Sequence, residues 1–435
     1  MTRPTPSFVS RAACWFRATF DDPSRAAFLF APLLGFLPLP LGSLATVWFF
    51  TGAAYVSVLW LTGRIGWVWP PSTAFGCIAC LAYFGVELLS PLLFPNRLAG
   101  LLDVGTTLHF LVFTVLVGAL IQSPRIDVFD LFLHGIRAGA ISALIYSASE
   151  VFVFGRWRAT AGMGNAIPFG DVAILAAGLS LIGFTRLPRP HKLFALVAMG
   201  AGFGACLLSQ TRGALLALPL IVLALGIYLW PTIRRRTAMA VLVLSVVGVT
   251  VGGLGIIANV PSRLAALKSS LETGQALNSH DESTAHRAIL WTYGAEAFLA
   301  RPVFGYGSQN AVGEVRRRAA RDGFDVPPYR HLHNEFITTA VGRGLVGLAA
   351  LLLLLAAPII VAIGSVRDDR YRDRVAFAIM LSGGYAIFGM TNLIFSHDQM
   401  NTVFVSAFLV LLVGVHQAAT GHTTFARPSF AAPKR

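Results

Sequence analysis

Charge is scarce in this sequence of 435 residues: Asp, Glu, Lys and Arg make up only 12% of it, whereas a soluble domain carries about 25%. Cysteine is scarce as well. Two of the four cysteines, Cys77 and Cys80, form a CxxC inside an apolar run, where packing residues are more common than a redox or zinc pair. No DxD, HExxH or Cys/His cluster is present, so we expect no metal and no cofactor. These shortages place the sequence in the membrane class and imply no disulfide framework.

Long apolar stretches are what the sequence has instead. It is 55% hydrophobic with a mean hydropathy of +0.69, and stretches of roughly 20 apolar residues, enough to cross about 30 Å of hydrocarbon, recur along it. The sequence predicts an all-α polytopic membrane protein with about twelve transmembrane helices. The predicted spans are 26–41, 43–62, 72–94, 104–122, 127–154, 167–185, 191–209, 213–230, 237–258, 336–363, 375–396 and 400–417.

The basic residues set the orientation. The first 25 residues lack an apolar core with a cleavage site, so we expect a cytoplasmic tail rather than a signal peptide. With both termini in the cytoplasm, the cytoplasmic segments hold nineteen Lys and Arg residues and the short outer loops hold four. This asymmetry follows the positive-inside rule. It also accounts for most of the net charge of +14, so nucleic acid is not an expected partner.

One connection is far longer than the others. Residues 259–335 form a predicted outer loop of 77 residues between the ninth and tenth spans. A connection of this length is usually functional and has helices of its own. We therefore divide the chain into a transmembrane bundle (1–258), a periplasmic loop domain (259–335) and a final three-span part with a short tail (336–435). Within the loop, residues 286–300 have apolar residues at helical spacing and predict an amphipathic helix lying over the membrane.

Arginines on the outer face are informative because the positive-inside rule acts against them there. They are Arg156 and Arg158 in the fifth-to-sixth loop, Arg212 in a very short turn, and Arg287 at the start of the amphipathic helix. A guanidinium is always charged and can bind phosphate oxygens through two parallel hydrogen bonds. Several of them around one outer cavity would bind a diphosphate. The alternative is that each is a snorkelling anchor at the membrane surface, and Arg212 fits this alternative least well.

Histidines form the second candidate group. His331 and His333 lie where the long loop enters the tenth span, and Asn334 can cap the following helix. The positive end of a helix dipole keeps a histidine neutral, which is the state that can take a proton from a sugar hydroxyl. A polar residue at the membrane surface is the equally acceptable alternative. His134, His191, His280 and His397 show no comparable context.

Charged residues inside predicted spans suggest a function of a different class. These residues are Glu87, Arg137, Glu150, Asp171 and Arg343. Such groups are costly in a membrane unless they are paired or face a cavity, and they can mark an ion or proton path. A lipid or solute transporter would need Glu87, Asp171 or Arg137, whereas an enzyme working at the outer surface would need Arg212, Arg287 and His333.

The motifs, taken together, resemble the O-antigen ligase and polymerase superfamily of bacterial envelope glycosyltransferases. Four matches occur in order: RATAGMGN (158–165), the TRG turn (211–213), HRAILWTYGAEAFLARPVFGYG (286–307) and HLHNEF (331–336). One departure concerns Arg343, which stands in GRGLVG where many members place an acidic residue. The resemblance covers residues from about 156 to 350, and the first 150 residues match only in hydropathy.

The resemblance implies a GT-C-like helical fold with a periplasmic cap, and an active site on the periplasmic face of the inner membrane. It implies transfer of a glycan from undecaprenyl pyrophosphate, with inversion and without a metal. The pyrophosphate-binding role falls on Arg212 and Arg287, with Arg158 and Arg156 as weaker candidates, and the catalytic role falls on His333 with Asn334.

The acceptor divides the superfamily into three activities. A ligase transfers glycan to lipid A-core, a polymerase joins repeat units, and a protein O-oligosaccharyltransferase modifies a serine. The single large outer loop favours the ligase, with the polymerase as the alternative. The short stretch after the last span makes the protein-modifying activity the least favoured.

Overall fold

The computed structural model describes residues 23–94, 97–123, 126–230, 240, 243, 279–324 and 326–421. The described part is all helical, with no β-strand. Eight of its helical segments are long and apolar enough to cross a membrane, and two shorter apolar helices accompany them. The structure therefore confirms an all-α polytopic membrane protein. The predicted span at 237–258 lies almost wholly outside the described residues, and the count of twelve is not confirmed.

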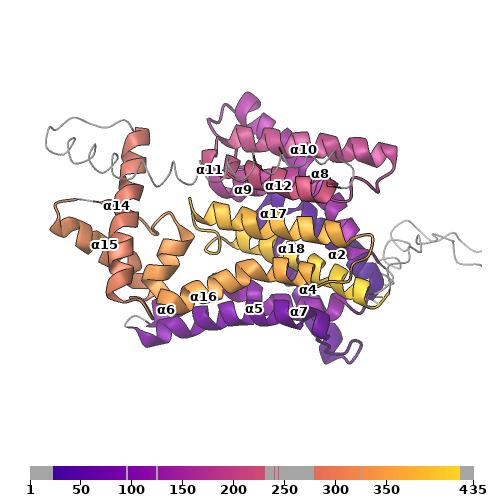
Figure 1. Cartoon of the computed structure of the whole chain (residues 1–435), viewed down its shortest axis with the longest axis horizontal. Coiled ribbons are helices and arrows are strands. Elements are labelled where there is room, and N and C mark those ends of the chain that lie inside the picture. Colours follow the sequence, from indigo (N-terminus) through magenta and orange to yellow (C-terminus); the bar gives the residue numbers. More distant parts are fainter. Residues whose placement is uncertain are drawn as a thin grey trace, which may run out of the picture.

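The membrane helices pack side by side in one bundle (Figure 1). In the most apolar stretch of α18, 78% of the residues are buried inside the protein, so α18 is the centre of the bundle. Around it, α16 packs on α5 and α17, and α9 packs between α8 and α10. The helices are α2 (Pro23–Phe36), α3 (Pro38–Leu41), α4 (Ser43–Leu61), α5 (Pro71–Leu89), α6 (Arg97–Asp103), α7 (Leu108–Leu120), α8 (Val128–Ala148), α9 (Ala166–Leu179), α10 (Arg189–Ser209), α11 (Arg212–Leu215), α12 (Leu218–Leu229), α14 (Ser279–Ala300), α15 (Ser308–Arg321), α16 (Glu335–Ile363), α17 (Tyr371–Gly389) and α18 (Asp398–Ala419).

Three predicted spans are interrupted in the structure. The first is divided into α2 and α3, and the eighth into α11 and α12, in each case close to a proline that cannot donate a helical hydrogen bond. The eleventh was predicted over 375–396, but α17 ends at Gly389. Residues 390–397 instead form a turn whose backbone groups are bound by side chains from α16. A hydropathy pattern does not contain these tertiary contacts.

The long loop forms a helical cap with its own small core. Ile289, Leu290 and Tyr293 of α14 pack there with Val315 of α15 and Leu332. In Figure 1, α14 runs across the axes of the bundle helices, as predicted for a helix lying over the membrane. The buried residues of its apolar face pack on α15 and on the segment that leads into α16.

The turn after α14 is locked to a break in α16. Gly344 has φ +64° and ψ −154°, a conformation that only glycine adopts readily, and it divides α16 into two parts. Four backbone hydrogen bonds join residues 302–307 to residues 341–346 at this break. They join Tyr306 N to Val341 O (2.9 Å), Gly307 N to Gly342 O (2.8 Å), Leu345 N to Pro302 O (2.7 Å) and Val346 N to Val303 O (3.3 Å). The Pro-x-x-Gly-x-Gly motif therefore connects the cap to the tenth span.

A side chain at Gly344 should disrupt this connection. In Gly344→Ala the added Cβ would lie 2.3 Å from the Val303 carbonyl oxygen in a backbone conformation that disfavours it. We expect a loss of about 1–3 kcal/mol of stability, seen as a lower melting temperature in detergent and faster proteolysis of the cap. Gly313→Ala on α15 is the control, because its Cβ meets nothing within 4 Å. The control should be neutral or stabilising by about 0.5–1 kcal/mol, and an equal loss in both variants would refute the assignment.

Candidate active site

The turn between α17 and α18, residues 390–397, is where the predicted site residues meet. Asn334 Nδ2 donates a hydrogen bond to the Met390 carbonyl oxygen at 3.1 Å. The buried carboxylate of Glu335 accepts the backbone N–H groups of Ile394 at 2.8 Å and Phe395 at 3.3 Å. Asn334 also caps α16 as predicted, because its Oδ1 accepts the N–H of Ile337 at 3.0 Å. The start of α16 is thus fixed to this turn.

The TRG turn (211–213) also contacts the turn at 390–397. Gly213 packs so close to Thr391 that an added Cβ would lie 2.8 Å from its hydroxyl oxygen. Arg212 is the first residue of α11, next to this contact, and its side chain is exposed. The structure therefore brings the neighbourhoods of Arg212 and of His333–Asn334 together, although 121 residues separate Arg212 from His333.

Arg158 holds the backbone that carries Arg212. Its Nε donates to the Ser209 carbonyl oxygen at 2.8 Å and its Nη2 to the Thr211 hydroxyl at 3.2 Å. The Thr211 hydroxyl in turn donates to the Ala166 carbonyl oxygen at 2.7 Å. The fifth-to-sixth loop and the TRG turn therefore form one connected unit.

Arg156 has a different partner. Its Nη1 lies 2.5 Å from Glu150 Oε1, and its side chain is 58% exposed. Glu150, one of the charged residues in the predicted spans, also accepts the N–H groups of Thr160 and Ala161, both at 2.8 Å. The Glu150 carboxylate shapes the loop, and Arg156 balances its charge.

Arg287 enters the site from the cap. It lies inside α14 and not at its start as predicted, because that helix begins at Ser279. Trp291, four residues further along the same face of the helix, donates its indole N–H to the Leu332 carbonyl oxygen at 3.0 Å. A hydrogen bond of 2.9 Å between His286 Nδ1 and the Tyr329 hydroxyl adds a second link. These contacts hold the Arg287 helix against the segment that carries the histidines.

His331 and His333 form a close pair. Their ring centroids are 4.2 Å apart, and His331 Nδ1 accepts the backbone N–H of His333 at 3.1 Å. Burial, followed by the nearby His331 and Arg287, lowers the pKa of His333 to about 3. The pKa of His331 falls to about 4 through burial, His397 and Arg287. Both rings are neutral at physiological pH, as predicted for a base, although burial and neighbouring positive charge are the causes.

His397 belongs to this group, and the prediction that it had no relevant context was wrong. It ends the turn at 390–397 and immediately precedes α18. His397 is the largest charge influence on His331, ahead of Arg287, and burial lowers its own pKa. No local sequence signal marks His397, because it lies 64 residues beyond His333 and only the packing of α17, α18 and α16 brings it near.

A buried ion pair lies deeper in the same end of the bundle. Arg343 Nη2 is paired with Glu87 Oε2, which joins α16 to α5. Arg343, which stands where the resemblance predicts an acidic residue, therefore has its carboxylate partner on α5. Glu87 Oε1 and Arg343 Nε are buried without a hydrogen-bond partner, so each depends on the pair for charge compensation.

The other charged residues in spans do not outline a path. Arg137 donates to the carbonyl oxygens of Ser180 at 3.0 Å and Ile182 at 2.6 Å, which satisfies the end of α9 and the turn after it. Asp171 is buried, with one carboxylate oxygen that has no partner. Within the described ranges, no three His, Cys, Asp or Glu side chains are arranged to hold a metal ion.

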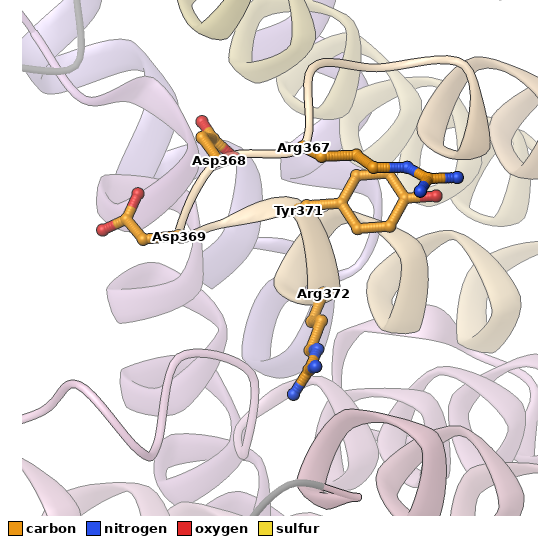
Figure 2. Close-up of a pocket in the computed structure, with 5 residues that line it drawn as sticks. All are labelled: Arg367, Asp368, Asp369, Tyr371 and Arg372. Carbon is orange, nitrogen blue, oxygen red and sulfur yellow. The ribbon is translucent and has the colours of Figure 1, made fainter.

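A cavity of about 480 Å³ lies elsewhere, in the turn between α16 and α17 (Figure 2). Its lining carries both charges, from Arg367, Asp368, Asp369, Tyr371 and Arg372. The 29 residues of α16, roughly 40 Å of helix, separate this turn from His333. The cavity is therefore far from the His333 segment.

Comparison with known proteins agrees with the motifs. Residues 194–352 match the model of a family described as O-Antigen ligase. This range contains the TRG turn, Arg287, the Pro-x-x-Gly-x-Gly turn and the His333–Asn334 pair. This part of the chain is therefore similar to the O-antigen ligase family, which agrees with the resemblance of the motifs.

Two curated proteins are similar to this chain. One is an O-antigen ligase of Escherichia coli, 24% identical over 315 residues, which are 70% of this chain and 70% of the relative. The other is an uncharacterized protein of Haemophilus influenzae, 24% identical over 259 residues, which are 57% of this chain. The second match spans 64% of the Haemophilus protein, slightly less than two thirds of its length.

Removal of Arg343 should expose the dependence of Glu87 on it. In Arg343→Met a buried carboxylate loses its partner, which costs about 3–5 kcal/mol, so the melting temperature in detergent should fall clearly. Arg317→Met is the control, since Arg317 forms a surface pair with Glu314 that is worth at most about 1 kcal/mol. The double variant Glu87→Gln, Arg343→Met should recover part of the loss. A double variant no better than the single one would show that the pair is not the cause.

Proposed function

We propose that this protein is an O-antigen ligase, which transfers a glycan from undecaprenyl pyrophosphate to a sugar hydroxyl of lipid A-core. The reaction takes place at the periplasmic face of the inner membrane, inverts the anomeric carbon and needs no metal. The observation that carries the proposal is the meeting of the TRG turn and the His333–Asn334 pair on the turn at 390–397. The family match and the Escherichia coli relative support the same activity.

The arginines bind the leaving group. Pyrophosphate leaves from the donor lipid, and the charge that grows on it must be stabilised. Arg212 is exposed on a short helix beside the site, and Arg287 reaches it from the cap. Guanidinium groups placed before the reaction stabilise such charge without reorganisation. Arg158 and Arg156 contribute mainly by shaping the loop, since their hydrogen bonds go to Thr211, Ser209 and Glu150.

His333 is the base that accepts the proton of the acceptor hydroxyl, and Asn334 positions it. His333 has a left-handed backbone (φ +52°), and the next residue is fixed by two side-chain hydrogen bonds. The low pKa makes His333 a weak base in the free enzyme. Arg287 is one cause of that low pKa, so a bound pyrophosphate beside Arg287 offsets the positive charge and makes His333 more basic. Donor binding thereby prepares the base.

A transporter is less well supported. The residues that it would need include Glu87 and Arg137, and both have structural partners within the bundle. The turn at 390–397 and the start of α16, where the proposed site lies, are at the end of the bundle beside the cap and not midway along the helices (Figure 1).

A reconstituted transfer assay tests the proposal. The purified protein is given undecaprenyl-pyrophosphate-linked glycan and rough lipopolysaccharide in the presence of EDTA. Arg212→Ala, Arg287→Ala and His333→Ala should each reduce the transfer rate by about 10²–10³-fold, because each removes a group that acts in the transition state. Arg317→Ala, on the outer face of α15, should keep the wild-type rate.

Each other outcome has a definite meaning. Full transfer by the three variants would refute the site. Elongation of the donor glycan without labelled lipopolysaccharide would identify a polymerase. Transfer that stops with EDTA would refute the metal-independent reaction.

The pH dependence tests the charge coupling. A base must be neutral, so kcat/KM for the donor should fall only as pH drops toward the pKa of His333, about 3, and not near the ordinary 6.5. Arg287→Gln removes a positive neighbour and should move this acid limb to higher pH. Both profiles use the same donor, so its own ionisation cancels in the comparison. An acid limb that stays in place, or moves to lower pH, would contradict the coupling.

A further inference from the structure

Large apolar side chains project outward from the part of the cap that joins the membrane bundle. Leu299 at the end of α14 is 74% exposed, and Val303 and Phe304 in the following turn are 49% and 55% exposed. None of these residues belongs to a segment that could cross a membrane. Three neighbouring large apolar side chains in this condition are unusual for a surface that faces water.

The backbone contacts fix the level of this turn relative to α16. Leu345 and Val346 donate hydrogen bonds to the carbonyl oxygens of Pro302 and Val303. Leu345 is itself 53% exposed and begins the long apolar run that crosses the membrane. Val303 and Phe304 therefore lie beside the first lipid-facing residues of a membrane span.

The same apolar surface continues on the other side of the turn. An added Cβ at Gly307 would lie 2.9 Å from the ring of Phe94, which places the 3₁₀ turn after α5 against it. The side chain of Gln309 is hydrogen bonded to Asp103, the last residue of α6. On α6, Leu98 and Leu102 are each 73% exposed. In addition, α6 packs against α15 of the cap.

We propose that the Pro302–Gly305 turn, the end of α14 and α6 form a foot that is embedded in the acyl-chain region of the leaflet next to the cap. The occupant of this surface is lipid because the surface is continuous with the exposed side of a membrane span. Arg301 lies over the ring of Tyr306 at 4.7 Å, an arrangement suited to the headgroup level just above the foot. The foot sets the height of α14, and with it the height of Arg287, relative to the membrane surface. This inference does not depend on the proposed activity.

Spin labels measure the surroundings directly. Single cysteines replace Leu299, Phe304 or Leu98 in the full chain with Cys14→Ser, since the other three cysteines are buried. The labelled protein is reconstituted in liposomes, and collision rates with oxygen and with a water-soluble nickel complex are compared. Leu352→Cys, half exposed within the α16 span, is the lipid control, and Arg317→Cys on α15 is the water control.

We expect labels at Leu299, Phe304 and Leu98 to collide with oxygen at least several-fold more than with nickel, as at Leu352. Nickel collisions at the level found for Arg317 would overturn the proposal, because the foot would then lie in water. Labels reached by neither reagent would also overturn it, since the surface would be covered by protein. All three labels retain a side chain on an exposed position, so the folded state is expected to persist, and gel filtration of each labelled variant verifies this.

Discussion

The carboxylate of Glu335 is the contact on which the site depends. It is buried at the first turn of α16 and accepts two backbone N–H groups of the turn that follows α17. Those amides have no helical partner, because α17 ends before them. Together with the Asn334 amide on the Met390 carbonyl oxygen, this contact converts the end of a membrane helix into a rigid support. The TRG turn and the segment that carries His333 are both packed against this turn.

Hydrogen bonds from side chains fix the backbones of two segments beside this turn. The TRG turn is held by hydrogen bonds from Arg158 and Thr211 to backbone carbonyl oxygens, and the histidine segment by bonds from Trp291 and Asn334. Arg212 itself is an exposed side chain on a four-residue helix. The backbones of both segments are therefore held in place by hydrogen bonds from side chains of other elements.

The sequence predicted the helices better than the contacts between them. Apolar length predicted most membrane helices, and the motifs singled out Arg212, Arg287, His333 and Asn334, whose roles stay predictions. It missed His397, because a lone histidine next to an apolar run has no local mark of function. It also missed the pairing of Arg343 with Glu87, because the sequence of one helix does not show which other helix will pack against it. The end of α17 was misplaced for the same reason: contacts from a distant helix overrode a continuous apolar pattern.

The connection between the Pro302–Gly307 turn and the break in α16 has a consequence for biogenesis. The turn is synthesised first, and its four backbone partners arrive only when residues 341–346 have left the ribosome. Until then its carbonyl and N–H groups remain bound to water, and the cap has no fixed place on the bundle. The cap therefore cannot be fixed to the bundle before the first part of the tenth span is in place.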